Sequence, residues 1–174
     1  MKFKLLCCGA LFVLAVAATP AQTKITSSGK CGKPDTAQSV TAGDKDGHVF
    51  MISAGKCVTG GHKVAGATSK EATFAEHDEV TGDHSKAWGV FVETFDSGDK
   101  IFYDYQSNAT VKDGKLVSGA DKYQITGGTG KMAGMKGSGT CKLSPGTAEG
   151  GLDYTCTGTY THGGAKAPAA AKKP

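Results

Sequence analysis

The feature that most constrains the fold is a succession of short segments that alternate apolar and polar residues. Tight turns such as "DSGD" and "KDG" join them, and no stretch between residues 47 and 160 keeps a helical period of 3.6 residues. Consecutive hairpins without helices predict an antiparallel meander, which can close on itself and remove its sheet edges. The expected fold is therefore an all-β, eight-stranded, antiparallel up-and-down barrel. The expected strands are 47–54, 61–68, 71–80, 87–95, 100–111, 115–126, 131–143 and 152–160, of which 61–68 has the weakest pattern.

The stretch "TGGTGKMAGMKGSG" (126–139) is rich in glycine and raises the question of a phosphate-binding loop. Such a loop needs a glycine five positions before its Gly-Lys pair and a serine or threonine after the lysine, followed by a helix. Ile125 and Met132 occupy these positions, and no helical pattern follows. The glycines are therefore interpreted as structural. Gly127 and Gly128 would form a tight turn with positive φ, and the later glycines would let the strands coil and approach closely.

The same residues, "GGTGKMAGMKG", resemble the G-G-T-G-x-[FYML]-x-G/A-x-G signature of the allene oxide cyclase-like barrels. This superfamily includes plant allene oxide cyclases, dirigent proteins and exported bacterial proteins, and the chain looks most like the exported bacterial members. The resemblance covers the motif and the meander, roughly residues 48–160. It implies an eight-stranded antiparallel barrel with a small lumen. Outside the glycine motif no residue matches a catalytic position, so the resemblance implies no catalytic residue.

The two ends of the chain differ from the part between them. Residues 1–21 join a lysine-containing start to an apolar run and then to small residues, which is the pattern of a cleaved signal peptide. The run is too short for a membrane span, which takes about 20 residues. The expected organisation is a signal peptide (1–21), an N-terminal arm (22–46), a β-barrel domain (47–160) and a disordered Ala/Lys/Pro tail (161–174). Export to the periplasm or the extracellular space, without a transmembrane segment, is therefore expected.

The charge of the chain argues against a nucleic-acid partner. All 20 basic residues are lysines, and without those of the signal peptide and the tail 15 lysines stand against 16 acidic residues. A specific nucleic-acid binder usually has a basic face rich in arginine. No nucleic-acid partner is therefore expected, and the sequence indicates no oligomeric state.

Four cysteines follow the predicted signal peptide, and an even number in an exported domain indicates two disulfides. If Lys142 faces Thr155, Cys141 faces Cys156 on the next strand. Directly opposed residues of an antiparallel pair lie close enough for a disulfide. The remaining pair would fasten the N-terminal arm to the barrel. The predicted bonds are Cys141–Cys156 and Cys31–Cys57.

Alternation also predicts which side chains line the lumen. A two-residue turn at Ser97-Gly98 pairs Phe95 with Lys100, and one face of this hairpin is then apolar or aromatic throughout. If Trp88 lies on this buried face, Trp88→Ala should cost about 3–5 kcal/mol of stability. The predicted ligand-binding residues of the lumen are Trp88, Val90, Val92, Ile101, Tyr103 and Tyr105.

Two polar groups are candidates for chemistry. The hairpin "EHDEVTGDH" gathers side chains that bind metals, but neighbours along a strand point to opposite faces, so no metal site is expected. These side chains are His77, Asp78, Glu79, Asp83 and His84. Glu93 and Asp104 lie diagonally on one face in the register above and could share a proton, although two solvated carboxylates are the favoured interpretation. No catalytic residue, metal or cofactor is therefore predicted.

The resulting hypothesis is a small exported barrel that binds an apolar or aromatic small molecule in its lumen without catalysis. A barrel of eight strands is just wide enough to be filled by side chains or to hold one such ligand. Two alternatives stay open. The first is a cyclase- or dirigent-type enzyme that acts in the lumen and needs an inward polar group. The second is a structural or stress protein with a solid core and no ligand.

Overall fold

The computed structural model describes residues 21–147 and 150–162, so nearly all of the predicted signal peptide and tail lies outside the described residues. The described chain is mostly β-strand, with one short 3-10 helix. The strands are β1 (Thr23–Cys31), β2 (Thr36–Thr41), β3 (His48–Thr59), β4 (Lys63–Val64), β5 (Ala67–Thr81), β6 (His84–Phe95), β7 (Lys100–Lys112), β8 (Lys115–Gly128), β9 (Lys136–Pro145) and β10 (Leu152–Thr161), and the helix is η1 (Gly130–Met132).

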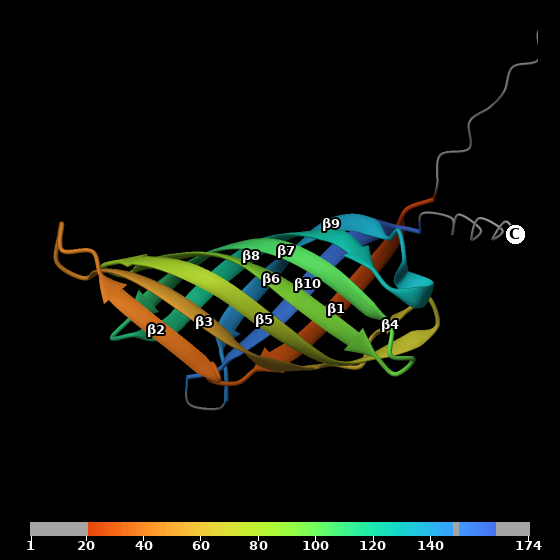
Figure 1. The fold of residues 1–174 in the computed structure, drawn as a ribbon, viewed down its shortest axis with the longest axis horizontal. Coiled ribbons are helices and arrows are strands. Elements are labelled where there is room, and N and C mark those ends of the chain that lie inside the picture. Colours follow the sequence, from red (N-terminus) through yellow and green to blue (C-terminus); the bar gives the residue numbers. More distant parts are fainter. Residues whose placement is uncertain (1–20, 148–149, 163–174) are drawn as a thin grey trace, which may run out of the picture.

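Eight of these strands form a closed antiparallel ring in the order β1, β3, β5, β6, β7, β8, β9, β10 and back to β1. Neighbours in the ring follow one another along the chain, except where β10 meets β1 (Figure 1). The predicted all-β, eight-stranded, antiparallel up-and-down barrel is therefore confirmed. The other two strands are additions to the ring: β2 pairs with β3 at one end of the barrel, and β4 pairs with β5 at the other.

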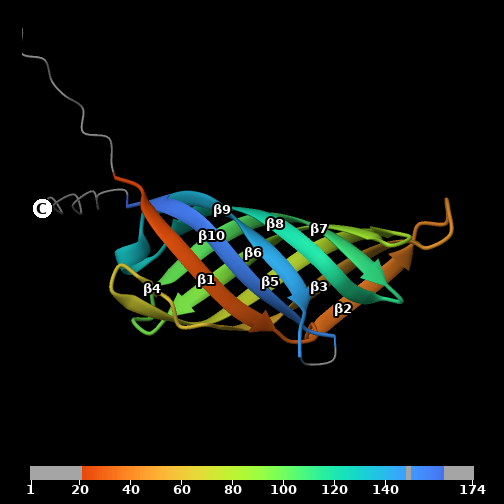
Figure 2. The same cartoon turned by 180° about the vertical axis from the view of Figure 1, so that it is seen from behind.

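One strand of the ring lies where the sequence predicts an N-terminal arm (22–46). β1 pairs with β10 along its whole length and with the end of β3, as Figure 2 shows from behind. The weak segment 61–68, by contrast, contributes only β4 and the start of β5. The pattern of β1 is faint because Ser27 and Gly29 occupy inward positions. The space above Gly29 is filled by Tyr154 of the neighbouring strand.

Both predicted disulfides are present, and each joins directly opposed residues of antiparallel strands. Cys141 on β9 faces Cys156 on β10, which confirms the predicted register of these two strands. Cys31 on β1 faces Cys57 on β3. The ring closes where β1 pairs with β10. One disulfide joins β1 to its other neighbour β3, and the second joins β10 to its other neighbour β9.

The hairpin between β6 and β7 differs from the prediction by one residue. Glu93 pairs with Ile101. The loop between the hydrogen-bonded residues Phe95 and Asp99 has three residues, whereas the sequence predicts a two-residue turn. The Phe95 N–H donates a hydrogen bond of 3.0 Å to the Asp99 carbonyl, and Gly98 has a φ of 81°. A glycine in this left-handed conformation is typical of a three-residue hairpin loop with a bulge. The loop therefore explains the change in register.

The shifted register turns the odd-numbered residues of β6 toward the lumen, because a slip of one residue reverses the face of a strand. Phe95 and Glu93 are buried there. The predicted lumen residues on β6 are therefore corrected to the outer face: Trp88, Val90 and Val92. Those on β7 point inward: Ile101, Tyr103 and Tyr105.

Apolar side chains fill the end of the barrel near β4 and η1. Part of this plug comes from the glycine-rich stretch 126–139, which forms the end of β8, then η1 and the start of β9 rather than one strand beginning at 131. Positive φ occurs at Gly130 and Gly134 and not at the preceding glycine pair. Gly130 has a φ of 52°, a left-handed conformation that favours glycine, and a Cβ there would also displace the Asp99 carboxylate. The most deeply buried residues of the plug are Val64, Phe95, Ile101, Met132 and Met135.

Inward-facing tyrosines lie over glycines of the neighbouring strands. Tyr105 is opposite Gly89, where a Cβ would stand 2.6 Å from the tyrosine hydroxyl oxygen. Tyr123 has the same relation to Gly139. The missing side chains make room for the rings, so these glycines allow the tyrosines to lie along the lumen wall.

Candidate binding site in the barrel lumen

The lumen contains two groups of buried polar side chains, and the first surrounds Glu93 beside the apolar plug. Glu93 is 3% exposed. Its Oε1 accepts a hydrogen bond from the Ser69 hydroxyl and lies 3.2 Å from Nε2 of His62. Its Oε2 accepts a hydrogen bond of 2.7 Å from the Tyr103 hydroxyl. These partners lie on β5, on β7 and in the segment between β3 and β4, so Glu93 connects three further parts of the chain.

Both carboxylate oxygens of Glu93 have polar partners, whereas the ring nitrogens of His62 are buried without a hydrogen-bond partner in the described ranges, Nε2 lying only at ion-pair distance from Glu93. Burial acts to raise the pKa of Glu93, but its contacts with His62, Ser69 and Tyr103 outweigh burial and hold this pKa below its ordinary value. Burial, together with the charge of Glu93, raises the pKa of Tyr103 well above its ordinary value, so the tyrosine keeps its proton and acts as a donor. Because both carboxylate oxygens are occupied, the group is suited to holding the fold together.

The predicted proximity of Glu93 and Asp104 is wrong. Asp104 pairs with Val90 and is exposed on the outer face of the barrel. Glu93 lies in the lumen. The change of one residue in the hairpin register puts the two carboxylates on opposite sides of the sheet.

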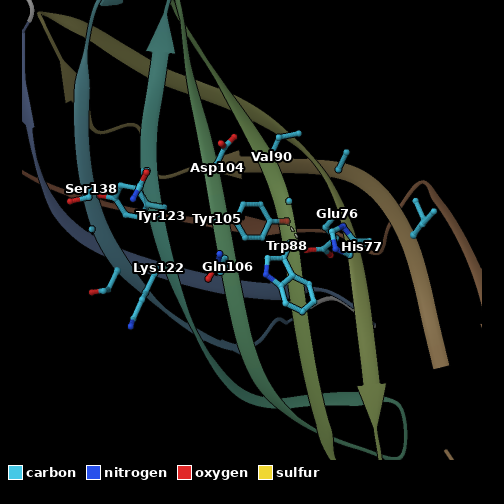
Figure 3. Close-up of a pocket in the computed structure, with 16 residues that line it drawn as sticks. Glu76, His77, Trp88, Val90, Asp104, Tyr105, Gln106, Lys122, Tyr123 and Ser138 are labelled. Atoms are coloured by element: carbon cyan, nitrogen blue, oxygen red, sulfur yellow. Dashed lines mark hydrogen bonds between the residues drawn. The ribbon is translucent and has the colours of Figure 1, made fainter. Parts of the chain in front are cut away.

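The second polar group lies in the half of the lumen away from η1, and it is acidic. Glu76 on β5 accepts hydrogen bonds of 2.6 Å from the Tyr105 hydroxyl and 3.2 Å from the Ser53 hydroxyl. Tyr105 reaches Glu76 across Gly89, which lies between them in the cross-strand register. Figure 3 shows the Tyr105 hydroxyl beside Glu76. Burial and the charge of Glu76 raise the pKa of Tyr105, so Tyr105 is the donor of this bond.

Two aspartates face the lumen one step further from η1. Asp78, Ala87, Ser107 and Asp121 are successive cross-strand partners on β5, β6, β7 and β8. Asp78 is 8% exposed, and its Oδ1 accepts a hydrogen bond of 3.4 Å from Ser85. Among the described residues, neither Oδ2 of Asp78 nor Oδ1 of Asp121 has a hydrogen-bond partner, although both atoms are buried. Only small side chains separate the two aspartates along the wall.

These aspartates are hard to ionise. Burial, followed by the negative charge of Glu76, raises the pKa of Asp78 to about 7, although the hydrogen bond from Ser85 opposes the shift. Burial also raises the pKa of Asp121 to about 6. The charges of Glu76, Asp121 and Asp78 all raise the pKa of Tyr105. The Tyr105 hydroxyl therefore lies within electrostatic range of all three carboxyl groups.

No buried cation balances this acidic group in the part of the chain that the structure describes. The sequence contains no arginine, and every lysine within 21–147 and 150–162 is exposed to solvent. Buried carboxyl groups without paired charges cost stability, and carboxyl groups with raised pKa values gather at functional sites. The acidic half of the lumen is therefore the candidate binding site.

Asp78→Asn is expected to stabilise the protein at about pH 8 and to have little effect at about pH 4. The folded-state pKa of Asp78 is raised from 3.8 to about 7. The folded state therefore favours the protonated carboxyl of Asp78. The contribution of this carboxyl to stability is complete below the unfolded-state pKa and is lost as the pH rises through the folded-state pKa. Partial access of water reduces the expected gain to about 1–2 kcal/mol at the higher pH. Urea denaturation of both proteins across this range measures the difference, and a variant less stable than the wild type at high pH would contradict the unpaired position of Asp78.

The predicted site residue Trp88 belongs to an outer surface. A depression of about 1100 Å³ crosses β3 and the strands from β5 to β9, and most of its lining residues face outward (Figure 3). The rings of Trp88 and His77 stack there, with centroids 5.2 Å apart and planes 15° apart. Of the six predicted ligand-binding residues, the three on β6 therefore lie outside and the three on β7 lie inside.

The polar hairpin of β5 and β6 is divided between the two faces, as its alternation predicts. His77 stacks on Trp88 outside, whereas Asp78 is buried inside. In the described ranges, no group of three or more histidine, cysteine, aspartate or glutamate side chains is arranged to hold a metal ion. No helix of these ranges is long and apolar enough to cross a membrane.

The acidic residues of the lumen are the functional candidates that sequence reasoning missed. In "EATFAEHDEV", the face that carries Phe74 also carries Glu76 and Asp78, so either choice of inner face is mixed. Asp121 sits in an equally mixed strand. The sequence feature that could have indicated them is the pair of small residues Ala87 and Ser107 at inward positions, because small side chains there leave space for the neighbouring carboxyl groups. This signal can be used only when the register is known.

No protein-family model matches the chain, and no curated protein sequence matches it. Two solved structures are similar to it in shape. The pterocarpan synthase dirigent protein GePTS1 is 11% identical, with a TM-score of 0.48 over 84% of this chain and 87% of that chain. Pyocyanin demethylase is 19% identical, with a TM-score of 0.39 over 78% of this chain and 99% of that chain. At these scores and identities, the fold assignment rests on the strand pairing described above, and the similarities carry no argument about function.

Proposed function

We propose that this protein is an exported barrel that binds a small apolar or aromatic molecule in the acidic half of its lumen, without changing it chemically. The observation that carries this proposal is the pair of buried, unpaired carboxyl oxygens on Asp78 and Asp121. Tyr105 and Tyr123 pair across β7 and β8 in the next inward row of the barrel, where Tyr123 is two residues from Asp121 on β8. A barrel of eight strands is wide enough to hold one small ligand.

The small inward side chains of β6 and β7 support the position of the ligand. The end near η1 is filled by large apolar side chains that are almost completely buried. From the row of the two aspartates onward, the inward residues of β6 and β7 are small: Ser85, Ala87, Ser107 and Ala109. Small side chains on the inside of a barrel leave space that large ones would occupy. Binding pockets also combine apolar walls with a few polar groups that fix the orientation of the ligand.

Ala109→Phe is expected to weaken the binding of the neutral fluorophore N-phenyl-1-naphthylamine by at least about tenfold. Wild-type protein should enhance the fluorescence of this probe with saturation at one molecule per barrel. Ala109 points into the acidic half of the lumen, so a phenyl ring there occupies the proposed site.

The matched control is Ala120→Phe, which adds the same ring to the outer face of the neighbouring strand and should leave binding unchanged. Circular dichroism checks that both variants fold. The proposal fails if the wild type shows no saturable binding, or if the two variants lose affinity equally.

Export is supported by the two disulfides and by the predicted signal peptide. Cys31–Cys57 and Cys141–Cys156 are both formed. Disulfides form and persist in oxidising compartments such as the periplasm and the extracellular space, and they are rare in the cytosol. The proposed ligand is therefore one that the protein meets outside the cytoplasm.

One observation favours a second candidate, a cyclase- or dirigent-type enzyme that acts in the same lumen. Asp78 has a pKa of about 7, and such a carboxyl group can accept or donate a proton at neutral pH. NMR spectra of a bound molecule after long incubation distinguish the two functions. An unchanged molecule supports binding alone, whereas conversion that Asp78→Asn abolishes supports the enzyme.

A further inference from the structure

The acidic half of the lumen also indicates the chemistry of its ligand. We propose that the bound molecule carries a protonated amine on an aromatic body, with the amine held by the carboxylates of Asp78 and Asp121. The rings of Tyr105 and Tyr123 contact the aromatic body. This inference rests on the proposed function, which is that the lumen binds a small molecule.

The unpaired carboxyl oxygens are the first argument. Oδ2 of Asp78 and Oδ1 of Asp121 are buried and have no hydrogen-bond partner within the described ranges. Buried polar atoms in folded proteins are almost always hydrogen-bonded, and an ionised carboxylate can only accept. The nearby hydroxyls of Ser85 and Ser107 supply one donor to each aspartate. A ligand with several N–H donors would complete the hydrogen bonding of both carboxylates.

The sign of the local charge is the second argument. Three carboxyl groups lie within electrostatic range of the Tyr105 hydroxyl, and the lysines of the described ranges are all on the outside. Like charges in a low-dielectric space repel one another, and an opposite charge placed among them favours their ionised forms. A cation therefore gains from this site, whereas an anion would add a further repulsion. A neutral molecule would leave the existing repulsion uncompensated.

The small number of acidic side chains in this row favours an organic ammonium over a metal ion. Asp78 lies on β5 and Asp121 on β8, with Ala87 and Ser107 between them in the same row. A metal ion requires its ligands at about 2.0–2.6 Å from one centre. Within the described ranges, no group of three or more histidine, cysteine, aspartate or glutamate side chains is arranged to hold a metal ion, whereas an ammonium group can share its three N–H donors between a carboxylate and neighbouring hydroxyl oxygens. Aromatic rings such as that of Tyr105 also attract a neighbouring cation.

Three indoles that differ at one group test this inference. Tryptamine carries an ammonium group, tryptophol has a hydroxyl in its place, and indole-3-propionate has a carboxylate. Each competes with N-phenyl-1-naphthylamine for the full-length mature protein at about pH 8, where the amine is charged and both aspartates are mostly ionised. Tryptamine is expected to compete at a concentration at least about tenfold lower than tryptophol, with indole-3-propionate the weakest.

The double variant Asp78→Asn/Asp121→Asn is expected to lose the preference for tryptamine while keeping its affinity for tryptophol within about twofold. It should fold, because it removes buried charges while the asparagine oxygens can still accept the hydrogen bonds of Ser85 and Ser107, and urea denaturation verifies this. Asp104→Asn is the matched control on the outer face, and it should keep the preference.

The outcomes separate the two proposals. If the fluorophore binds but the three indoles compete equally, or none displaces it, the amine inference is overturned and the binding function stands. The same holds if the double variant keeps the preference for tryptamine. If the fluorophore does not bind to the wild type, the proposed function fails and the amine inference fails with it.

Discussion

Phe95→Ala is expected to lower the free energy of unfolding by about 3–5 kcal/mol. Phe95 is 1% exposed and packs in the apolar plug with Ile101, Met132 and Met135. Truncation removes the favourable transfer of a whole ring from water and leaves a cavity between strands of the closed barrel, which can collapse only in part. The loss is a large share of the total stability of a small domain, which is about 5–15 kcal/mol.

Trp88→Ala is the matched control, because Trp88 is an aromatic residue of the same strand that faces outward. Its ring stacks on His77, so truncation should cost only about 0.5–1.5 kcal/mol. Urea denaturation followed by circular dichroism measures both variants without depending on the single tryptophan. A larger loss for Trp88→Ala than for Phe95→Ala would show that β6 has the opposite register and that Trp88 faces the lumen.

Glu93→Ala is expected to cost a similar amount, about 3–5 kcal/mol, because it breaks a buried charged network from its centre. The change leaves the hydroxyls of Tyr103 and Ser69 without their common acceptor, and it removes the carboxylate that lies 3.2 Å from Nε2 of His62. Each buried donor that loses its partner keeps its desolvation cost. Chemical denaturation at about pH 7 measures the loss, which should shrink in acid because the pKa of Glu93 is lowered in the folded state.

Glu93→Gln is the control for the charge, since it keeps the length of the side chain and one accepting oxygen. It should cost roughly 1.5–3 kcal/mol, less than the alanine variant. Tyr103→Phe removes a single donor and should cost less again. If Glu93→Ala proves almost neutral, the group around Glu93 does not hold the fold together, and this carboxylate would have to be reconsidered as a chemical group.

The parts of the fold that could be predicted from the sequence depend on local patterns. Alternation on β7 correctly assigns Ile101, Tyr103 and Tyr105 to the lumen, because these apolar residues occupy one face of a single strand. The disulfide Cys141–Cys156 follows from a short loop between two adjacent strands. The closed ring follows from consecutive hairpins, although β1 supplies the strand that the sequence assigns to 61–68.

The face of β6 could not be predicted because it depends on one residue in a loop. With a two-residue turn, the apolar side chains of Trp88 and Val90 would fill the lumen, which is the more obvious choice. The actual loop has Gly98 in the left-handed conformation and three residues, so Glu93 turns inward. A buried glutamate is acceptable only because His62 and Ser69 reach it from other parts of the chain. Such long-range partners cannot be recognised in a single sequence.

The position of the acidic site also depends on hairpin register, in this case on the register of three hairpins. Asp78 and Asp121 are far apart in the chain and meet in one row only because three hairpins place them there. A shift of one residue in any of these hairpins would send one of them to the outer face. The chemistry of the lumen is therefore a property of the register rather than of any motif.

Intermolecular NOEs can place a bound small molecule inside or outside the acidic half of the barrel. The methyl groups of Ala87 and Ala109 face the lumen, whereas those of Ala75 and Ala120 face outward on neighbouring strands. With N-phenyl-1-naphthylamine bound to the wild-type protein, we expect NOEs from the aromatic protons of the probe to the two inner methyl groups and none to the outer pair. NOEs to Ala75 or Ala120 alone would place the ligand on the outer surface and rule out binding in the lumen.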